Sequence, residues 1–403
     1  MKTNEIRLGE QCVVTSSKRF HLSERITQGV PFYCSKEIIK KFNGEDVTEC
    51  DYISEDLYKK VSNEFGVPKE NDLLITTRGT IGIPYLYKRT DRFYFADGNL
   101  TWIKDFDSNL YSKFLYYWFQ SYEGRKKFEA LAKGTAQKAV PISGIKTLEI
   151  ELPSLKSQKR IADILSAYDD LIENNQKQIK LLEEAAQRLY KEWFVDLRFP
   201  GHENTKIVDG VPEGWQWCKV RDVADINSSA LPKNYKEDFI DYVDLGSVRC
   251  GHIETRARYN LNEAPGRAKR CAKDGDIIWG MVRPNLKAYA LVTNPKETDV
   301  FSTGFAVLSA KKVPYSYLYC AVTQEEFVGY LVNATNGAAY PAVKPVHFEV
   351  ADILKPDDKV LEQFHSVADS IYRKKEALEN QNHNLRESRD LILPKLMSGE
   401  VEV

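Results

Sequence analysis

Apolar residues recur every seven positions along two long and otherwise polar tracts of the chain. This heptad spacing is typical of α-helices that pack in a coiled coil. The first tract spans residues 158–195, and the second lies near the end of the sequence. The apolar positions are Ile161, Tyr168, Leu182 and Leu189 in the first tract, with Asn175 in one core slot, and Phe364, Ile371, Leu378, Leu385 and Ile392 in the second. The pattern predicts two long helices, each with a narrow apolar stripe.

A helix of about 40 residues spans roughly 60 Å, and a narrow stripe on so polar a helix indicates a coiled-coil seam. Each predicted helix has the other as its simplest partner. We expect the pair to be antiparallel, because a globular segment separates the helices and duplicated halves tend to be related by a pseudo-two-fold axis. The layer that holds Asn175 should then meet one near Leu378, and a lone polar core residue can set the register.

The two halves of the sequence repeat one another, which is the mark of internal duplication. Residues 72–75 correspond to residues 276–279, and residues 134–153 match residues 337–356 at the offset of 203 that separates Gly134 from Gly337. The same offset relates the two heptad tracts. The long helices therefore occupy equivalent places in two similar halves.

The segments outside the heptad tracts predict mixed domains. Short apolar or alternating runs at residues 72–76, 85–87, 276–279 and 305–308 predict strands, and residues 111–128 and 315–331 predict helices. The predicted fold class is α+β, with two similar mixed α/β domains separated by two long antiparallel coiled-coil helices and related by internal duplication. The expected boundaries are 1–152 for the first domain, 153–198 for the first spacer helix, 199–355 for a linker and the second domain, and 356–403 for the second spacer helix and a C-terminal tail.

Composition narrows the class of protein. A chain of 403 residues exceeds what one hydrophobic core usually organises. Its seven cysteines are odd in number, scattered and never in a CxxC pair, which argues against a disulfide framework or a zinc site and for a reducing compartment. The start of the chain is polar and no run of about 18 apolar residues occurs, so we expect a cytoplasmic protein without a signal peptide or a membrane span.

The sequence contains no familiar catalytic motif. A P-loop, HExxH and GxSxG are all absent, and the six histidines lack metal-ligand spacing, so we expect no metal site. The only Asn-Pro is followed by Lys296 and does not form the motif of a DNA amine methyltransferase. Residues 356–359, Pro-Asp-Asp-Lys, resemble a nuclease fragment, but an Asp before a helix is a good N-cap. These observations favour a binding protein over an enzyme.

Several features point to nucleic acid as the ligand. Residues 249–273 carry seven Lys and Arg against Glu254 and Glu263, although a solvated loop face would look similar. Arg78-Gly79-Thr80 follows a strand-like run in one half, and residues 280–285, Gly-Met-Val-Arg-Pro-Asn, follow the equivalent run in the other. Gly allows close backbone approach, and Arg or Asn can read base edges. Small-residue loops at 134–138 and 336–340 also recur, so a pair of binding loops is expected in each half.

The sequence resembles the specificity (S) subunit of type I restriction-modification systems over essentially its whole length. The pieces that carry the resemblance are Tyr-Ile-Ser-Glu at 52–55, DLLITTRGTIG at 72–82, Leu152-Pro153 with Gln158 and Ile161, LYKEWFVD at 189–196, VPEGW at 211–215 and LPKLMSGE at 393–400. Their order and spacing make the match specific. The resemblance implies a subunit without catalytic activity that has two target-recognition domains held apart by two helices, and that reads a bipartite DNA target.

The resemblance also implies partners. Double-stranded DNA, two methyltransferase subunits and restriction-translocase subunits would bind this chain, while S-adenosylmethionine, ATP and Mg would belong to the partner subunits. Because the two domains differ in loop sequence, the target should be asymmetric. The candidate DNA contacts, drawn from the loops and the basic segments, are Lys18, Arg19, Arg78, Thr80, Gln137, Lys138, Arg249, Arg256, Arg258, Lys269, Arg283, Asn285 and Tyr340.

An aromatic group ends the first heptad tract at Trp193 and Phe194. These rings either fill the junction between helix and domain or contact a methyltransferase subunit, because aromatic side chains are favoured anchors of interfaces. Two other hypotheses for the whole chain stay open at this point. One is a coiled-coil scaffold that presents two protein-binding domains, and the other is a DNA-modifying enzyme with an unrecognised site.

Overall fold

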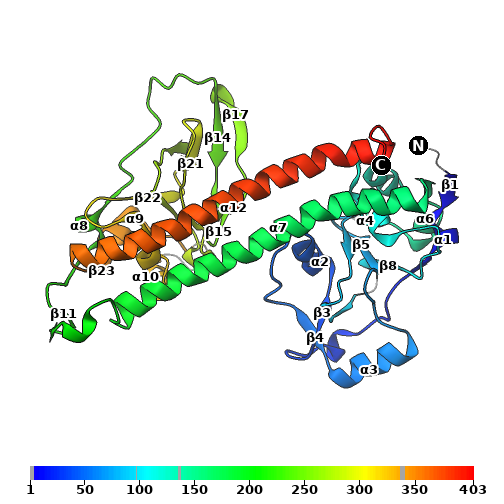
Figure 1. Ribbon diagram of the computed structural model, residues 1–403, viewed down its shortest axis with the longest axis horizontal. Coiled ribbons are helices and arrows are strands. Elements are labelled where there is room, and N and C mark those ends of the chain that lie inside the picture. Colours follow the sequence, from blue (N-terminus) through cyan, green and yellow to red (C-terminus); the bar gives the residue numbers. More distant parts are fainter. Residues whose placement is uncertain (1–3, 97, 135–137, 336–340) are drawn as a thin grey trace. The chain divides into compact units, whose positions relative to one another are not determined.

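The computed structural model describes residues 4–96, 98–134, 138–335 and 341–403, which form two compact units (Figure 1). Unit 1 comprises Met1–Gln176 and Asn380–Val403, and unit 2 comprises Lys177–Glu379. Two long helices, α7 (Leu155–Tyr190) and α12 (Asp358–Ser398), contribute residues to both units. Within the described ranges, we find no helix with the length and apolar character needed to cross a membrane.

Unit 1 contains a four-stranded sheet of order β2-β8-β5-β6, a three-stranded sheet of order β4-β3-β7 and a ribbon of β1 with β9. Its strands are β1 (Asn4–Arg7), β2 (Val13–Thr15), β3 (Val30–Tyr33), β4 (Asp51–Ile53), β5 (Leu73–Thr76), β6 (Pro84–Leu86), β7 (Tyr94–Phe95), β8 (Leu100–Lys104) and β9 (Glu149–Leu152). Its helices besides α7 and α12 are α1 (Leu8–Gln11), η1 (Leu22–Glu24), α2 (Ser35–Phe42), α3 (Glu55–Glu64), α4 (Ser112–Gln120), α5 (Tyr122–Ala130) and α6 (Ile142–Lys146).

Unit 2 contains sheets of order β13-β22-β19-β20 and β17-β14-β21-β18, together with the ribbons β10-β11, β12-β23 and β15-β16. Its strands are β10 (Ile207–Val208), β11 (Val211–Pro212), β12 (Gln216–Lys219), β13 (Ala224–Ile226), β14 (Phe239–Val243), β15 (Val248–Arg249), β16 (His252–Ile253), β17 (Ala257–Asn260), β18 (Ala268–Arg270), β19 (Ile277–Gly280), β20 (Tyr289–Leu291), β21 (Asp299–Ser302), β22 (Phe305–Ala310) and β23 (Asp352–Lys355). Its helical segments are η2 (Lys191–Val195), η3 (His202–Asn204), α8 (Val220–Val223), η4 (Leu245–Ser247), η5 (Leu261–Glu263), η6 (Pro284–Leu286), α9 (Tyr315–Val322), α10 (Glu325–Asn333) and α11 (Pro345–Glu349).

The two units share one topology. The sheet β2-β8-β5-β6 corresponds to β13-β22-β19-β20, and each unit has a second sheet with one parallel pair, β3 with β7 and β14 with β21. The antiparallel ribbon of β1 with β9 ends just before α7, and the ribbon of β12 with β23 ends just before α12. The internal duplication predicted from the sequence repeat is therefore confirmed.

One inner strand of each unit, β5 in unit 1 and β19 in unit 2, is buried on both faces. In β5, Leu73 and Ile75 join the core beneath the helices, whereas Leu74 joins the core shared with the three-stranded sheet. In β19, Ile277 and Ile278 divide in the same way between two clusters. Successive side chains of a strand point to opposite faces, so a strand between two layers needs an unbroken apolar run. This burial explains why the two runs are the clearest strand signals in the sequence.

In unit 1 the two long helices pack antiparallel. The Asp169 carboxylate of α7 pairs with the Arg389 guanidinium of α12 at 2.6 Å, and further along α7 the Asn175 Nδ2 donates to the Asn382 Oδ1 at 3.0 Å. Numbers rise along one helix as they fall along the other, which confirms the predicted direction. The buried polar layer lies at Asn382, one helical turn beyond the expected neighbourhood of Leu378.

In unit 2 the remaining parts of α7 and α12 also run antiparallel. The Glu183 Oε1 lies 2.9 Å from the Lys375 Nζ, and the Trp193 and Phe364 ring centroids lie 5.9 Å apart. The helix pair is thus an antiparallel seam within each unit (Figure 1). Near the middle of the helices, the buried polar and charged residues Asn175, Lys375 and Asn382 alternate with the buried apolar residues Ile172, Ile179 and Leu378.

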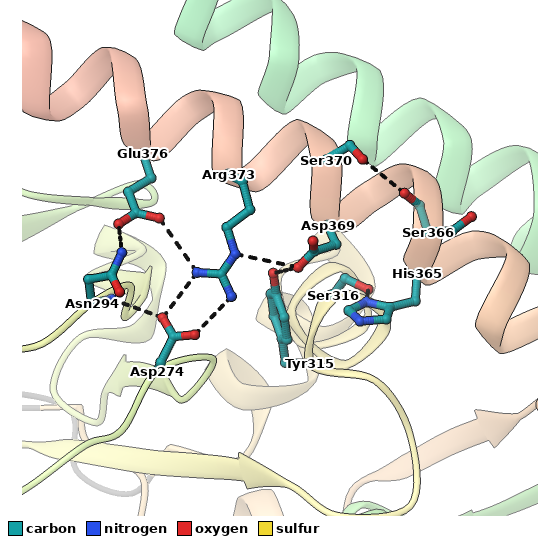
Figure 2. A network of polar contacts seen from close by, with 10 residues as sticks. All are labelled: Asp274, Asn294, Tyr315, Ser316, His365, Ser366, Asp369, Ser370, Arg373 and Glu376. Carbon is teal, nitrogen blue, oxygen red and sulfur yellow. Dashed lines mark hydrogen bonds and ion pairs between the residues drawn. The ribbon is translucent and has the colours of Figure 1, made fainter.

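A polar network fastens α12 to the sheet layer of unit 2 (Figure 2). The Arg373 guanidinium makes two hydrogen bonds to the Asp274 carboxylate, at 2.8 and 3.2 Å, and lies 3.5 Å from Glu376. The Asn294 backbone N–H donates to Asp274 at 2.9 Å, and the Asn294 amide donates to Glu376. The bidentate contact with Asp274 raises the pKa of Arg373 above its usual range. A charge-assisted pair of this kind fixes orientation as well as distance.

Each long helix predicted outside the heptad tracts is instead two helices. Residues 111–128 divide into α4 and α5 at Ser121, whose hydroxyl accepts from the Gly124 N–H at 3.1 Å and caps α5. The corner is tight, because a Cβ on Gly124 would lie 1.9 Å from the Trp118 carbonyl oxygen. The equivalent tract of unit 2 divides into α9 and α10. The prediction of one helix was wrong in both places. In unit 1 a hydroxyl cap and a close backbone approach leave the apolar period almost unchanged, and in unit 2 the break comes at Thr323 and Gln324 without a side-chain hydrogen bond from Gln324 that caps α10.

Candidate nucleic-acid interface

In unit 1 two loops meet at the carboxyl end of β5. The loop that follows β5 carries Arg78 and Thr80, and the loop that returns towards α6 carries Lys138. Arg78 forms an isolated β-bridge with Ala139, and the Gly79 N–H donates to the Lys138 carbonyl at 3.4 Å. The side chains of Arg78, Thr80 and Lys138 are all exposed. The structure therefore brings together three residues that were separate candidates in the sequence.

The equivalent loops of unit 2 meet at the carboxyl end of β19. Val282 bridges Ala342, and the Arg283 N–H donates to the Pro341 carbonyl at 2.8 Å. Arg283 has a φ of 50°, in the left-handed region that residues other than Gly seldom adopt, and it is exposed together with Asn285. Gln137 and Tyr340 lie outside the described residues.

The basic segment of unit 2 does not form a single patch. Arg249 lies in β15, Arg256 and Arg258 lie in or beside β17, and Lys269 lies in β18. β17 and β18 are the opposite edges of the sheet β17-β14-β21-β18. All four side chains are exposed. Arg256, Arg258 and Lys269 thus lie at opposite edges of one sheet, and Arg249 lies on the separate ribbon of β15 with β16.

Two arginines of this segment pair with carboxylates of the inner strands β14 and β21. Arg258 makes a bidentate contact with Asp241, with Nε to Oδ1 at 2.9 Å and Nη2 to Oδ2 at 3.0 Å, and the Arg256 Nε lies 3.3 Å from Asp299. Hydrogen bonds from Arg258 hold the pKa of Asp241 below its usual value, despite the opposing effect of burial. Both arginines keep a large exposed fraction, 62% for the Arg258 side chain and 37% for Arg256. They can therefore brace the sheet and still face a ligand.

Lys18 and Arg19 line a pocket of about 480 Å³ in unit 1. The other residues that line this pocket, among them Phe65, Trp102 and Lys104, were missed by sequence reasoning. The Lys104 ammonium lies 4.4 Å from the centroid of the Trp102 ring, and the Lys18 ammonium lies 4.7 Å from that of Phe65. The residues come from three separate segments, and only the pairing of β2 with β8 places Lys104 beside Val13.

The aromatic end of the first heptad tract is packed into unit 2. Phe194 is 5% exposed, and its ring centroid lies 4.8 Å from that of Tyr317 and 5.0 Å from that of Phe364. Trp193 is partly buried and packs against the edge of the same cluster. The chain follows a π-helical turn over Lys191–Val195 before it leaves α7. This packing supports the hypothesis that Phe194 fills the junction, and a partner contact at Trp193 stays a prediction.

A buried charged cluster joins the β15–β16 turn of unit 2 to both long helices. The Lys375 ammonium, on a residue only 5% exposed, donates to the Gly251 carbonyl at 2.8 Å and lies 2.9 Å from Glu183 and 3.4 Å from Glu379. His252 lies between the same two carboxylates, with Nδ1 at 2.7 Å from Glu379. Burial opposes its charge, but the hydrogen bonds to Glu183 and Glu379 raise the pKa of His252 to about 9. Burial also opposes the charge of Lys375, whose pKa the two carboxylates nevertheless raise.

The acidic residues that resemble a nuclease fragment cap a helix. The Asp357 Oδ1 accepts from the Val360 N–H at 3.1 Å at the start of α12, and its Oδ2 accepts from the Trp215 indole at 3.2 Å. Among the residues that the structure describes, His, Cys, Asp and Glu form no group of three or more that could hold a metal ion. The predicted N-cap role of this segment is therefore confirmed.

Comparison with known proteins gives a consistent result. Residues 3–184 match the family model described as the type I restriction modification DNA specificity domain. The type I restriction enzyme MjaIX specificity subunit of Methanocaldococcus jannaschii is 27% identical over 303 residues, which cover 72% of this chain and 69% of the relative. The HindI specificity subunit of Haemophilus influenzae is 22% identical over 358 residues, which cover 72% and 77%.

A solved structure shares the fold. The crystal structure of the type I restriction-modification S subunit from M. genitalium aligns with a TM-score of 0.61 at 15% identity, covering 98% of this chain and 96% of that one. A duplicated sheet topology, a heptad-patterned helix pair and these sequence matches agree with the resemblance read from the motifs. This chain is similar in sequence to the type I restriction-modification specificity subunits, and it shares the fold of one of them.

Proposed function

We propose that this chain is the DNA-recognition subunit of a type I restriction-modification enzyme and that units 1 and 2 each read one half of a bipartite target. The observation that carries the proposal is the pair of loops that recurs at the carboxyl end of the central strand in both units. Exposed Arg, Lys, Thr and Asn side chains at such loops can reach base edges and phosphates. Specificity is a property of these loops, and the sheets hold them in place.

The two loop pairs carry different side chains, which favours an asymmetric target. Unit 1 presents Arg78, Thr80 and Lys138, whereas unit 2 presents Arg283 and Asn285. A bidentate Arg reads guanine best, and a bidentate Asn reads adenine best. The two half-sites should therefore differ in sequence, with unread base pairs between them.

The chain would act together with other subunits. In this proposal it docks two methyltransferase subunits, and through them restriction-translocase subunits, and it has no catalytic activity of its own. The S-adenosylmethionine, ATP and Mg that the complete enzyme needs for DNA methylation and cleavage would be bound by those partners. The names of the curated relatives, which describe subunits of type I restriction enzymes, support this assignment.

Selection from a random duplex pool tests the proposal. The chain is co-expressed with its methyltransferase partner, and the DNA that the complex retains is sequenced. A two-part asymmetric motif with a fixed unread gap is the expected result. An enriched pool without a motif, or no retention at low salt, would overturn the proposal and favour a scaffold that presents two protein-binding domains. Turnover of S-adenosylmethionine by the chain alone would instead indicate an enzyme.

Two variants of unit 2 separate base reading from phosphate contact. Arg283→Ala should relax one position of the selected motif, at a cost of about 1–3 kcal/mol for the preferred base. Lys269→Ala should weaken binding to all sequences and lower the salt slope by about 0.9. Equal salt slopes for Lys269→Ala and the wild type would exclude a phosphate contact at that residue.

A further inference from the structure

The pocket that Lys18 lines in unit 1 is cationic and is held by aromatic rings. Trp102 is 3% exposed and Tyr94 is fully buried, so these rings support the wall and present little free surface. The Lys104 and Lys18 ammonium groups cover the Trp102 and Phe65 rings, and such cation–π contacts restrict two otherwise flexible side chains. Lys104 also lies 3.5 Å from the exposed Asp105 carboxylate. The pocket therefore offers positive charge to a ligand. Its Trp102 and Tyr94 rings are buried, and the Lys18 ammonium lies over the half-exposed Phe65 ring.

Two serine hydroxyls at the same place have no hydrogen-bond partner among the described residues. The Ser16 and Ser17 Oγ atoms are buried, although both residues line the pocket. A buried hydroxyl without a partner is costly. The Lys18 N–H is fixed by donation to the Tyr94 hydroxyl at 2.9 Å, so the loop that carries these groups is anchored in the sheet layer.

The equivalent place in unit 2 lacks these features. Leu74 pairs with Trp102 in unit 1, and the equivalent Ile278 pairs with Val307 in unit 2, so an aliphatic side chain replaces the indole. The same register replaces Lys104 by Ser309. Lys311, the first residue after β22, pairs with the Asp225 carboxylate at 2.8 Å.

The start of the loop after β13 is held to β22 by hydrogen bonds. The Asn227 Oδ1 accepts from the Val307 N–H at 3.0 Å, and the Asn227 N–H donates to the Val307 carbonyl at 2.7 Å. The pocket is thus a property of unit 1 that the duplication does not explain.

We propose that this pocket holds one phosphodiester of the DNA backbone in the half-site read by unit 1. The inference rests on the proposed function, and it adds a contact that fixes the position of unit 1 along the DNA. A volume of about 480 Å³ accommodates a phosphate with its flanking sugars. Fixed ammonium groups and hydroxyl donors match a phosphate oxyanion, whereas a stacked base would need a free ring face. Phosphate contacts position a protein on DNA without reading sequence, so the pocket sets where the Arg78 loop meets the bases.

A double-mutant cycle between protein and DNA tests this assignment. The complete chain with its methyltransferase partner is titrated with duplexes that carry its selected target, in which each backbone phosphate is replaced in turn by a neutral methylphosphonate. The proteins are the wild type, Lys18→Ala, the conservative Lys18→Arg and Lys126→Ala. Lys126 is an exposed lysine of α5 outside the pocket and serves as the matched control for loss of one charge.

One phosphate in the unit 1 half-site should behave differently from all others. Neutralisation of this phosphate should weaken DNA binding by the wild type roughly tenfold, as expected for one charge-assisted contact. It should weaken DNA binding by Lys18→Ala less than about twofold. Lys18→Ala should also lower the salt slope by about 0.9, and Lys18→Arg should restore it. Lys18 is exposed, so the melting temperature of the variant should equal that of the wild type.

The other outcomes separate the two proposals. If Lys18→Ala behaves like Lys126→Ala and its effect is additive with every methylphosphonate, the phosphate pocket is wrong while DNA recognition stands. If the coupled phosphate lies in the half-site read by unit 2, the placement of the pocket on the DNA is wrong. If the wild-type complex shows no sequence-selective binding at all, the proposed function fails and the pocket assignment fails with it.

Discussion

The buried ammonium of Lys375 should be the most sensitive charged position in unit 2. We consider the substitution Lys375→Met, which keeps an unbranched side chain of similar length and removes only the charge. In the wild type this ammonium faces the Glu183 and Glu379 carboxylates at 2.9 and 3.4 Å and donates to the Gly251 carbonyl. Without it the two carboxylates share His252 as their remaining close cation in the cluster.

The size of the effect follows from burial. Loss of one partner from a buried ion pair costs about 3–5 kcal/mol, because the other charge is left uncompensated. The Glu183 and Glu379 side chains keep 27% and 34% exposure, so we take the lower end, about 3 kcal/mol. For a domain of the size of unit 2 this corresponds to a fall of roughly 6–12 °C in melting temperature.

Thermal unfolding at neutral pH measures the loss, and Lys374→Met is the matched control. Lys374 is the preceding residue on α12 and is exposed, so its substitution should change stability by no more than about 0.5 kcal/mol. Adding Glu183→Gln and Glu379→Gln to Lys375→Met should recover much of the loss, because the uncompensated charge is then removed. Equal melting temperatures for Lys375→Met and Lys374→Met would refute this account of the cluster.

Three further predictions concern His252 and the two long helices. The folded pKa of His252 is raised from 6.5 to about 9, so its stabilising effect should be complete below about pH 6.5 and lost as the pH rises through 9. The difference in melting temperature between the wild type and His252→Gln should therefore vanish at high pH. A difference that stays constant with pH would contradict this prediction. Asn175→Leu should lower the free energy of unfolding by about 1–3 kcal/mol, because it leaves the Asn382 amide unpaired. The urea midpoint of the double variant Asn175→Leu/Asn382→Leu should be higher than that of Asn175→Leu. A still lower midpoint would argue against a polar layer in which both amides are hydrogen-bonded. Phe194→Ala should lower the free energy of unfolding, measured in urea, by about 3–5 kcal/mol, and Trp193→Ala should lower it by less. Equal losses would show that both rings fill the junction.

Local sequence patterns were sufficient to predict the helices and strands whose burial leaves one regular hydrophobic pattern. The heptad tracts predicted α7 and α12, and the unbroken apolar runs predicted β5 and β19, because burial of a helix stripe or of both strand faces leaves a direct trace in the order of residues. The offset between Gly134 and Gly337 revealed the duplication. It also predicted which loops are equivalent, since equivalent positions in a repeat occupy equivalent places in its units.

The register of the helix pair and the corner between α4 and α5 were harder to predict from the sequence. The polar layer was placed near Leu378 and lies at Asn382, because successive apolar layers look alike and only a polar partner for Asn175 distinguishes one from the next. The division of α4 from α5 depends on the Ser121 hydroxyl and on the approach of Gly124 to a carbonyl oxygen. Neither feature alters the apolar pattern enough to be seen in the sequence.

The sequence by itself determined the resemblance to a family, the duplication and the two long helices, because each is recorded in repeated patterns or in motifs of fixed order. The tertiary structure decided which charges stand together. It spread the basic segment over two sheet edges, paired Arg258 with the Asp241 carboxylate, and assembled Lys18, Phe65 and Lys104 from distant segments into one pocket. Electrostatic and cation–π contacts act through distance in space, and strand pairing, which brings distant segments within a few ångströms, sets those distances.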